Sequence, residues 1–146
     1  MSKLRKAGKI LLILLGLAVL TMAVALAASE PGRREVKNLV IGTIDFHILK
    51  DGTYAGEYVG EKDHSRDVLL QVTIASGKIT EIKLVKGAVD KEGVPLILTQ
   101  GLSVKDLFES AVKTQSLQVD AISGATLTSK THLKALENAL LKALEK

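Results

Sequence analysis

Hydrophobic residues follow three different patterns along the chain, and the first is an unbroken apolar run near the N-terminus. It extends from Ile10 to Ala28, and Thr21 is its only residue with a side-chain hydroxyl. An α-helix rises about 1.5 Å per residue, so this run forms a helix about 28 Å long, close to the hydrocarbon core of a bilayer at about 30 Å. The run therefore predicts a transmembrane or signal helix.

The second pattern has a period of two, which is typical of a strand with one buried face. Residues 67–75, DVLLQVTIA, alternate apolar and polar side chains, and residues 76–78, SGK, supply a turn. Residues 78–86 return as a strand with Ile82 and Leu84 facing inward. A further short strand is expected at Thr53–Tyr58, after a turn at Asp51-Gly52. This part of the chain predicts an antiparallel sheet.

The third pattern has the helical period. Residues 103–115 begin with Ser103 as a cap and Asp106 three residues later, followed by an apolar stripe. A last helix is expected at about Leu127 to Glu145, with Leu133, Leu136, Leu140 and Leu144 at helical spacing. Strands followed by helices predict an α+β fold, with a small antiparallel sheet and packed helices, preceded by the N-terminal transmembrane or signal helix.

We expect three parts: residues 1–28 as signal anchor or signal peptide, 29–50 as a juxtamembrane linker, and 51–146 as the folded domain. The helical spacing of apolar residues within 36–44 leaves open whether part of the linker is helical, because Gly42 and β-branched residues disfavour a helix. Residues 87–101 are expected to be irregular or partly helical, and residues 115–119 to be extended.

Charge around the apolar run predicts its orientation. Lys3, Arg5, Lys6 and Lys9 precede it without any acidic residue, which places the N-terminus in the cytoplasm and the domain outside. The pattern Ala25-Leu26-Ala27 is also one that a signal peptidase accepts, so cleavage after Ala27 would give a secreted protein. The length of the run favours retention, hence a single-pass protein of the cytoplasmic membrane anchored through residues 10–28.

Composition excludes several classes of protein. Four of the 20 basic residues lie within residues 1–28, so 16 remain to balance the 16 acidic residues of the exported part. A net charge of zero there argues against a nucleic-acid surface. The chain has no cysteine, hence neither disulfides nor thiolate metal sites. His47, His64 and His132 show no metal-ligand spacing and are expected in solvated positions on loops or on a helix surface.

The candidate chemistry lies at the entrance to the last helix. Residues 119–130, VDAISGATLTSK, place four hydroxyl residues around a Gly-Ala turn: Ser123, Thr126, Thr128 and Ser129. Such a cluster is usually a helix cap, for which one hydroxyl is enough. Gly124 also permits close approach of a ligand, and a helix N-terminus attracts phosphate. A threonine here could contact a phosphate or carry one as an ester, and spacing alone does not choose.

These residues resemble a known motif. Asp120, Ala121-Ile122, Ser123, Gly124, Ala125 and Thr126 match, without departure, the flavinylation motif of an FMN-binding domain. That domain is found in the C subunit of sodium-translocating NADH:quinone reductase, in the G subunit of Rnf-type complexes and in small exported flavoproteins. The resemblance extends to DGTYAGEY at residues 51–58, to residues 72–85 and to the last helix, and so covers residues 51–141.

The resemblance implies that FMN is attached covalently, through a phosphoester, to Thr126. A separate exported flavin transferase would make this bond, with FAD as donor and a divalent metal. Asp120 and the Ser123-Gly124 turn would be read by the transferase and afterwards shape the phosphate site. The cofactor-binding residues expected are Thr126, Asp120, Ser123, Gly124, Ala125, Thr128 and, as a contact of the flavin ring, Tyr54.

The expected function is that of an extracytoplasmic electron-transfer flavoprotein, itself a substrate of the transferase and served by a membrane electron donor or redox complex. Nothing in the sequence builds a catalytic acid, base or substrate pocket, so an electron carrier is favoured over a substrate-converting enzyme. Two alternatives stay open at this point: a flavin-bearing partner of a separate reductase, and a non-redox exported binding module.

Tyr54 and Tyr58 lie four residues apart on one strand face. Tyrosines in such positions are more often plain core residues than contacts of a flavin ring.

Overall fold

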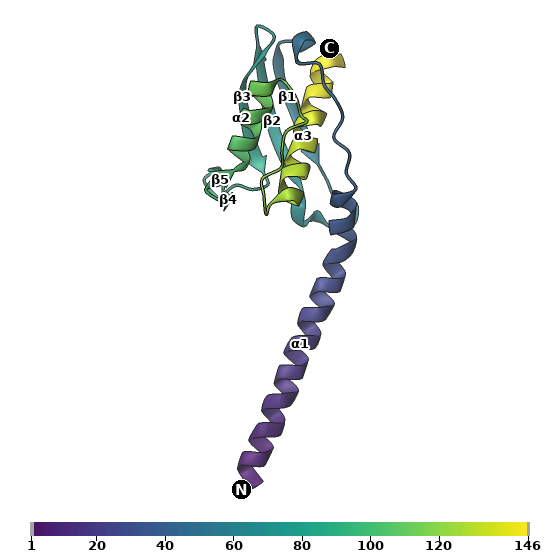
Figure 1. The fold of residues 1–146 in the computed structure, drawn as a ribbon, viewed down its shortest axis with the longest axis vertical. Helices are drawn as coiled ribbons and strands as arrows, with labels where there is room; N and C mark the ends of the chain where they lie inside the picture. The colour runs from purple at the N-terminus through teal and green to yellow at the C-terminus, as the bar shows by residue number, and fades with distance from the viewer. Residues whose placement is uncertain (1, 146) are drawn as a thin grey trace.

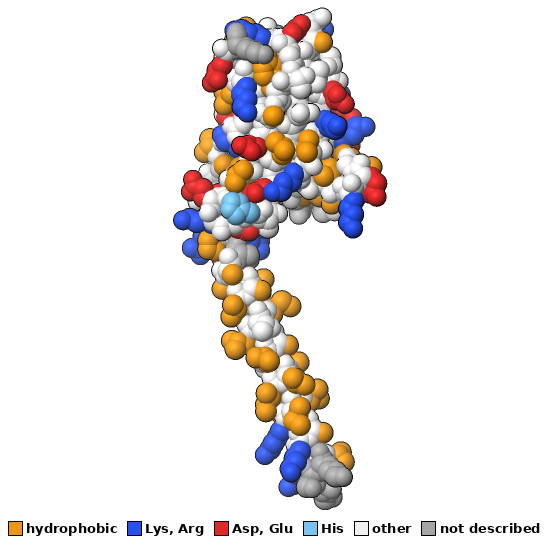
Figure 2. Space-filling view, turned by 180° about the vertical axis from the view of Figure 1, so that it is seen from behind, with side chains coloured by type: hydrophobic (Ala, Val, Ile, Leu, Met, Phe, Trp, Pro, Cys, Tyr) orange, Lys and Arg blue, Asp and Glu red, His pale blue; other side chains and the backbone are white. Residues whose placement is uncertain are grey.

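The computed structural model describes residues 2–145, with the side chains of all of these except residues 2, 3 and 29. Helix α1, Ser2–Lys37, projects from one end of a small domain (Figure 1). Figure 2 shows apolar side chains along most of its length, between a basic N-terminal end and the charged residues where α1 meets the domain. By length and composition α1 can cross a membrane, as the apolar run predicts.

A three-stranded antiparallel sheet forms the centre of the domain, with strand order β1-β2-β3. Its strands are β1, Gly52–Tyr58, β2, Val68–Ala75, and β3, Lys78–Lys86. Ser76 and Gly77 connect β2 to β3 with φ of 55° and 71°, the two positive values that a tight hairpin turn of the primed type requires. The predicted hairpin and the first strand are confirmed.

One face of the sheet is covered by helix α3, Thr126–Glu145, which lies across β1 and β2 (Figure 1). The inward side chains of β2 are almost fully buried against it, as their alternation predicts. Gly56 permits this packing, since a Cβ at that position would collide with the backbone oxygen of Ala135. The core is therefore an interface between strands and one long helix, which is the predicted α+β arrangement.

Helix α2, Val104–Thr114, lies beside α3 and begins with the predicted cap. The Ser103 hydroxyl accepts a hydrogen bond from the Lys105 N–H, and the Asp106 carboxylate accepts one from the Ser103 N–H. Of the two alternatives expected for residues 87–101, irregular or partly helical, the first is confirmed and no helix forms there. That segment is irregular, with a bridge between Val89 and Pro95, and ends in a small hairpin of β4, Ile97–Thr99, and β5, Leu102–Ser103.

Several residues between 32 and 50 pack against the rest of the domain. α1 continues to Lys37 and buries Val36, and the chain then adds the 3₁₀ turn η1, Phe46–Ile48, whose Phe46 is also buried. The Glu35 carboxylate accepts hydrogen bonds from the N–H groups of Glu61 and Lys62. The loop 59–67, which includes the 3₁₀ turn η2, His64–Arg66, is thereby fastened to α1. The boundaries expected after residue 28, between anchor and linker, and before residue 51, between linker and domain, remain predictions.

Candidate functional site

The Ser-Gly pair of the motif forms a tight turn directly before α3. The Ala125 N–H donates to the Ile122 carbonyl oxygen at 2.9 Å, which closes the turn over Ser123 and Gly124. Gly124 has a φ of +80°, a value that the third residue of a type II turn requires and that glycine adopts without strain. A Cβ on Gly124 would also lie 3.2 Å from Thr99 Cγ2. Backbone conformation and space therefore both favour glycine here.

Ser129 fastens this turn to the first turn of α3. Its hydroxyl donates to the Ala125 carbonyl at 2.9 Å and accepts from the Ile122 N–H at 3.0 Å. Ser129 is completely buried, so its hydroxyl is satisfied inside the protein and does not face a ligand. Of the four clustered hydroxyl residues, this one has a structural role.

Most residues of the motif itself lie at the surface, although Ile122 is buried. Asp120, Ser123, Gly124 and Thr126 are exposed, whereas Ala125, together with Thr128, is half-buried. Thr126 is the first residue of α3, and the first α-helical hydrogen bond runs from the Ser129 N–H to the Ala125 carbonyl. The N–H groups of residues 126–128 precede that bond and so have no intrahelical acceptor. No acidic side chain lies in the first turn of α3, so the N-terminal end of this helix is suited to bind an anion.

Thr99 supports the turn from a distant part of the sequence. Its hydroxyl donates to the backbone oxygen of Ser123, which joins β4 to the motif. Residues 99 and 123 are far apart in the chain, and a side-chain bond to a carbonyl leaves no pattern in the sequence. No feature of the sequence therefore indicates that Thr99 supports the motif.

His132 is buried, and the expectation that it lies on a solvated surface is wrong. Its Nδ1 donates to the Thr128 carbonyl oxygen at 2.7 Å, and its Nε2 accepts from the Ala88 N–H at 3.1 Å. Both ring nitrogens are used only when the imidazole is neutral, and burial lowers the pKa of His132 to about 4. The ring thereby ties the segment after β3 to the first turns of α3.

Two lysines join the first half of α3 to the end of α1. Lys130 Nζ donates to the carbonyl oxygens of Lys37, at 2.6 Å, and Leu39, at 3.2 Å. Lys134 Nζ donates to the Val40 carbonyl oxygen at 3.1 Å. These bonds place positive charge on the carbonyl of the last residue of α1 and on two carbonyls of the segment that follows it. The position of the motif is thus set relative to α1.

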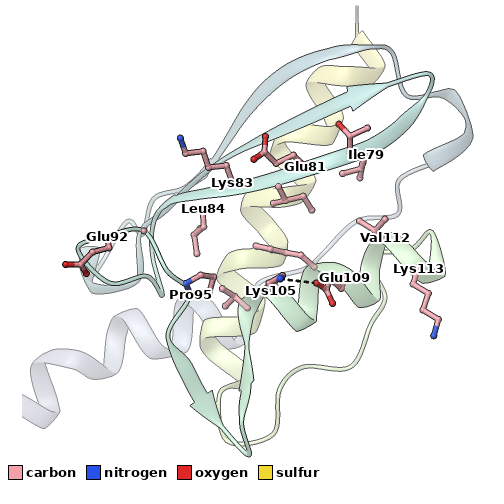
Figure 3. Close-up of a pocket in the computed structure, with 15 residues that line it drawn as sticks. Ile79, Glu81, Lys83, Leu84, Glu92, Pro95, Lys105, Glu109, Val112 and Lys113 are labelled. Atoms are coloured by element: carbon pink, nitrogen blue, oxygen red, sulfur yellow. Dashed lines mark ion pairs between the residues drawn. The ribbon is translucent and has the colours of Figure 1, made fainter.

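A groove of about 670 Å³ lies between the edge strand β3 and α2 (Figure 3). Its lining is apolar at its floor and charged at its rim: Ile79, Ile82, Leu84, Phe108 and Val112, with Glu81, Lys83, Lys105, Glu109 and Lys113. The Phe108 ring lies 6.4 Å, centroid to centroid, from the ring of His132, which is bonded to the first turn of α3. The groove and the motif are therefore connected through the same packed residues.

Tyr54 lies away from the motif. Its hydroxyl donates to the carbonyl oxygens of Lys50 and Asp51, and the Lys50 N–H donates to the Ala143 carbonyl oxygen near the C-terminus of α3. Thr126 is at the other end of that helix, 17 residues or about 25 Å away along its axis. The structure places Tyr54, like Tyr58, in the core, and we do not include it in the site.

The geometry agrees with a family assignment from sequence comparison. A sequence model of the FMN-binding domain matches residues 63–141, which is more than half of the chain and includes the whole motif. The chain belongs to the FMN-binding domain family. Its cofactor is therefore FMN, and its role includes binding of a flavin.

The FMN-binding domain also resembles a solved structure. The crystal structure of the CPE2226 protein from Clostridium perfringens is similar over 66% of this chain and 90% of that chain, with 29% sequence identity and a TM-score of 0.50. A search of curated proteins finds no match.

The residues of the motif fit a phosphorylated cofactor. An exposed threonine opens a helix whose first N–H groups are free to bind phosphate oxygens, and a glycine leaves room beside it. When bound, FMN supplies the redox chemistry, while the protein supplies position and surroundings.

Proposed function

We propose that this protein is an extracytoplasmic electron-transfer flavoprotein that carries FMN phosphoester-linked to Thr126. The observation that carries the proposal is the position of Thr126. It is an exposed hydroxyl residue at the first position of α3, directly after a Gly124 turn and beside unbonded backbone N–H groups. A phosphate on this side chain would meet the positive end of the helix.

The neighbouring hydroxyls are less suited to carry the cofactor. Ser129 is buried and has both a donor and an acceptor partner inside the protein. Thr128 is half-buried, and its backbone carbonyl accepts hydrogen bonds from His132 and Thr131. Ser123 is exposed but lies within the turn before the helix begins. Thr126 alone combines exposure with the first helical position.

Attachment requires a second protein in this proposal. A flavin transferase outside the cytoplasm would use FAD and a divalent metal. The Thr126 oxygen would bond to the FMN phosphorus, the phosphoanhydride bond of FAD would break, AMP would leave, and the hydroxyl proton would pass to a base of the transferase. Asp120 and Ser123 are exposed, as Thr126 is, and are therefore accessible to such an enzyme.

Covalent attachment suits a carrier outside the cell. Occupancy of a non-covalent site depends on the ratio of free ligand to dissociation constant, so dilution would empty it. An ester removes that dependence. The groove between β3 and α2 is lined by the half-buried apolar side chains of Ile79, Ile82 and Val112, on which the flavin ring can pack, and its volume is typical of cofactor sites. The electron donor would be a membrane protein or redox complex near the anchor.

The test is an intact mass of the full chain coexpressed with an exported flavin transferase. The wild type is expected to gain one FMN less one water, located on the tryptic peptide Thr114–Lys130. Thr126→Val should fold and remain colourless, and the matched control Thr128→Val should stay yellow. Covalent flavin on the Thr126→Val variant, or an unmodified wild type beside an active transferase, would overturn the proposal. The same spectrum shows whether cleavage occurs after Ala27.

A further inference from the structure

The hairpin of β4 and β5, with the residues just before it, exposes apolar side chains that no described residue of the domain covers. The exposed fractions are 68% for Ile97 and 38% for Leu102 in the hairpin, and 56% for Val94 and 44% for Leu96 in the segment just before it. Four exposed aliphatic residues within nine consecutive positions are more than scattered surface residues, and a cluster of this kind marks an interaction site. The hairpin also contacts the cofactor motif, through the bond from Thr99 to Ser123.

The position of α1 indicates what this surface meets. α1 leaves the domain at the end where the hairpin and the first turn of α3 lie, whereas the β2–β3 turn and the C-terminus lie at the opposite end (Figure 1). Lys130 and Glu35 fasten this end of the domain to the last turns of α1. The domain therefore has a defined orientation on its anchor.

The height of the domain above the bilayer follows from the length of α1 between the end of the apolar run and the first contact of the helix with the domain. The apolar run ends at Ala28, and a Cβ on Gly32 would collide with the side chain of Asp63. Four residues of helix span about 6 Å. The headgroup layer on each side of a bilayer has a thickness of about 5–8 Å. The end of the domain that surrounds α1 thus lies at the headgroup layer when α1 spans the membrane.

We propose that the β4–β5 hairpin docks on the lipid bilayer that α1 spans, with Ile97 and Leu102 in the interfacial layer. This rests on the membrane anchoring in the proposed function, but not on flavin attachment. Apolar side chains of surface-bound segments enter the boundary between headgroups and acyl chains by about 5–10 Å, which is within reach of a hairpin already at headgroup level. Docking holds the first turn of α3, and with it the cofactor, at the membrane surface.

The experiment uses the full chain in vesicles of phosphatidylcholine and phosphatidylglycerol. The chain has no cysteine, so Ile97→Cys and Leu102→Cys each give one site for an environment-sensitive fluorophore. Lys78→Cys, exposed at the opposite end of the sheet, is the matched control. Lipids with a nitroxide near the headgroup should quench the labels at 97 and 102 several-fold more than the label at 78, and aqueous iodide should show the reverse order.

Equal quenching at all three sites would overturn the docking proposal and leave this surface for a protein partner. The same measurement on Thr126→Val protein should give unchanged quenching, so a failure of flavin attachment does not affect the result. Flotation of the vesicles tests the anchor separately. Protein that does not float with the lipid would overturn the anchoring, and the docking with it.

Discussion

The buried imidazole of His132 should make the stability of the domain depend on pH between 7 and 5. Protonation would remove the acceptor for the Ala88 N–H, because Nε2 would become a donor. Burial lowers the pKa of His132 to about 4 in the folded protein, whereas an unfolded chain has the ordinary value of about 6.5. Between these values the unfolded state binds a proton that the folded state does not. Stability is therefore lost as the pH falls through this window.

The magnitude follows from linkage. One pH unit within the window changes the free energy of unfolding by about 1.36 kcal/mol, and pH 5 lies about 1.5 units below the unfolded pKa. We expect the free energy of unfolding to decrease by about 2 kcal/mol from pH 7 to pH 5. The lower limit of pH 5 lies above the pKa values of ordinary carboxylates in an unfolded chain, so these groups take up few protons in this range.

Urea unfolding of the unflavinylated full chain in nonionic detergent measures this directly. The chain has two tyrosines and no tryptophan, and Tyr54 and Tyr58 are both buried in the domain, so tyrosine fluorescence reports on the domain and not on α1. His132→Gln should reduce the dependence on pH, while His47→Gln, an exposed site, should leave it as in the wild type. A flat profile from pH 7 to 5 in the wild type, or an equal slope in His132→Gln, would show that the folded protein does not hold His132 neutral in this range.

Three further substitutions test the motif. Ser129→Ala should lower the free energy of unfolding in urea by about 1–3 kcal/mol, since it leaves the Ile122 N–H buried without its acceptor. A decrease below a few tenths of a kcal/mol would show that the hydroxyl does not hold the turn. Gly124→Ala should cost about 1 kcal/mol or more from its positive φ and should lower the flavin yield seen by intact mass, and wild-type stability would contradict the assigned turn. Thr126→Ser keeps the hydroxyl and should retain some flavin, so peptide mapping that finds none on the new side chain would count against the ester.

Local patterns in the sequence predicted most elements of the fold. The alternation of Val68, Leu70, Val72 and Ile74 predicted a strand with one buried face, because side chains of a strand point to opposite sides in turn. The Ser103 cap predicted the start of α2 to the residue, because a capping box involves only neighbours in the chain. The motif from Asp120 to Thr126 is likewise contiguous, so its position at the start of a helix was accessible from the sequence.

Which of these residues are buried, and which contacts support the motif, depends on how the elements pack together. A helical stripe predicts one buried face, but α3 is covered by the sheet on one side and contacted by α1 and α2 elsewhere, and Thr131, His132 and Leu133 are all buried. Thr99 and Lys130 act through bonds to carbonyl oxygens of distant residues, and every residue except the last of a chain offers such an oxygen in the same form. The elements and the motif follow from local patterns in the sequence. The burial of His132, the support of the turn and the orientation of the motif on its anchor follow from the packing of the chain, because they depend on contacts between segments far apart in the sequence.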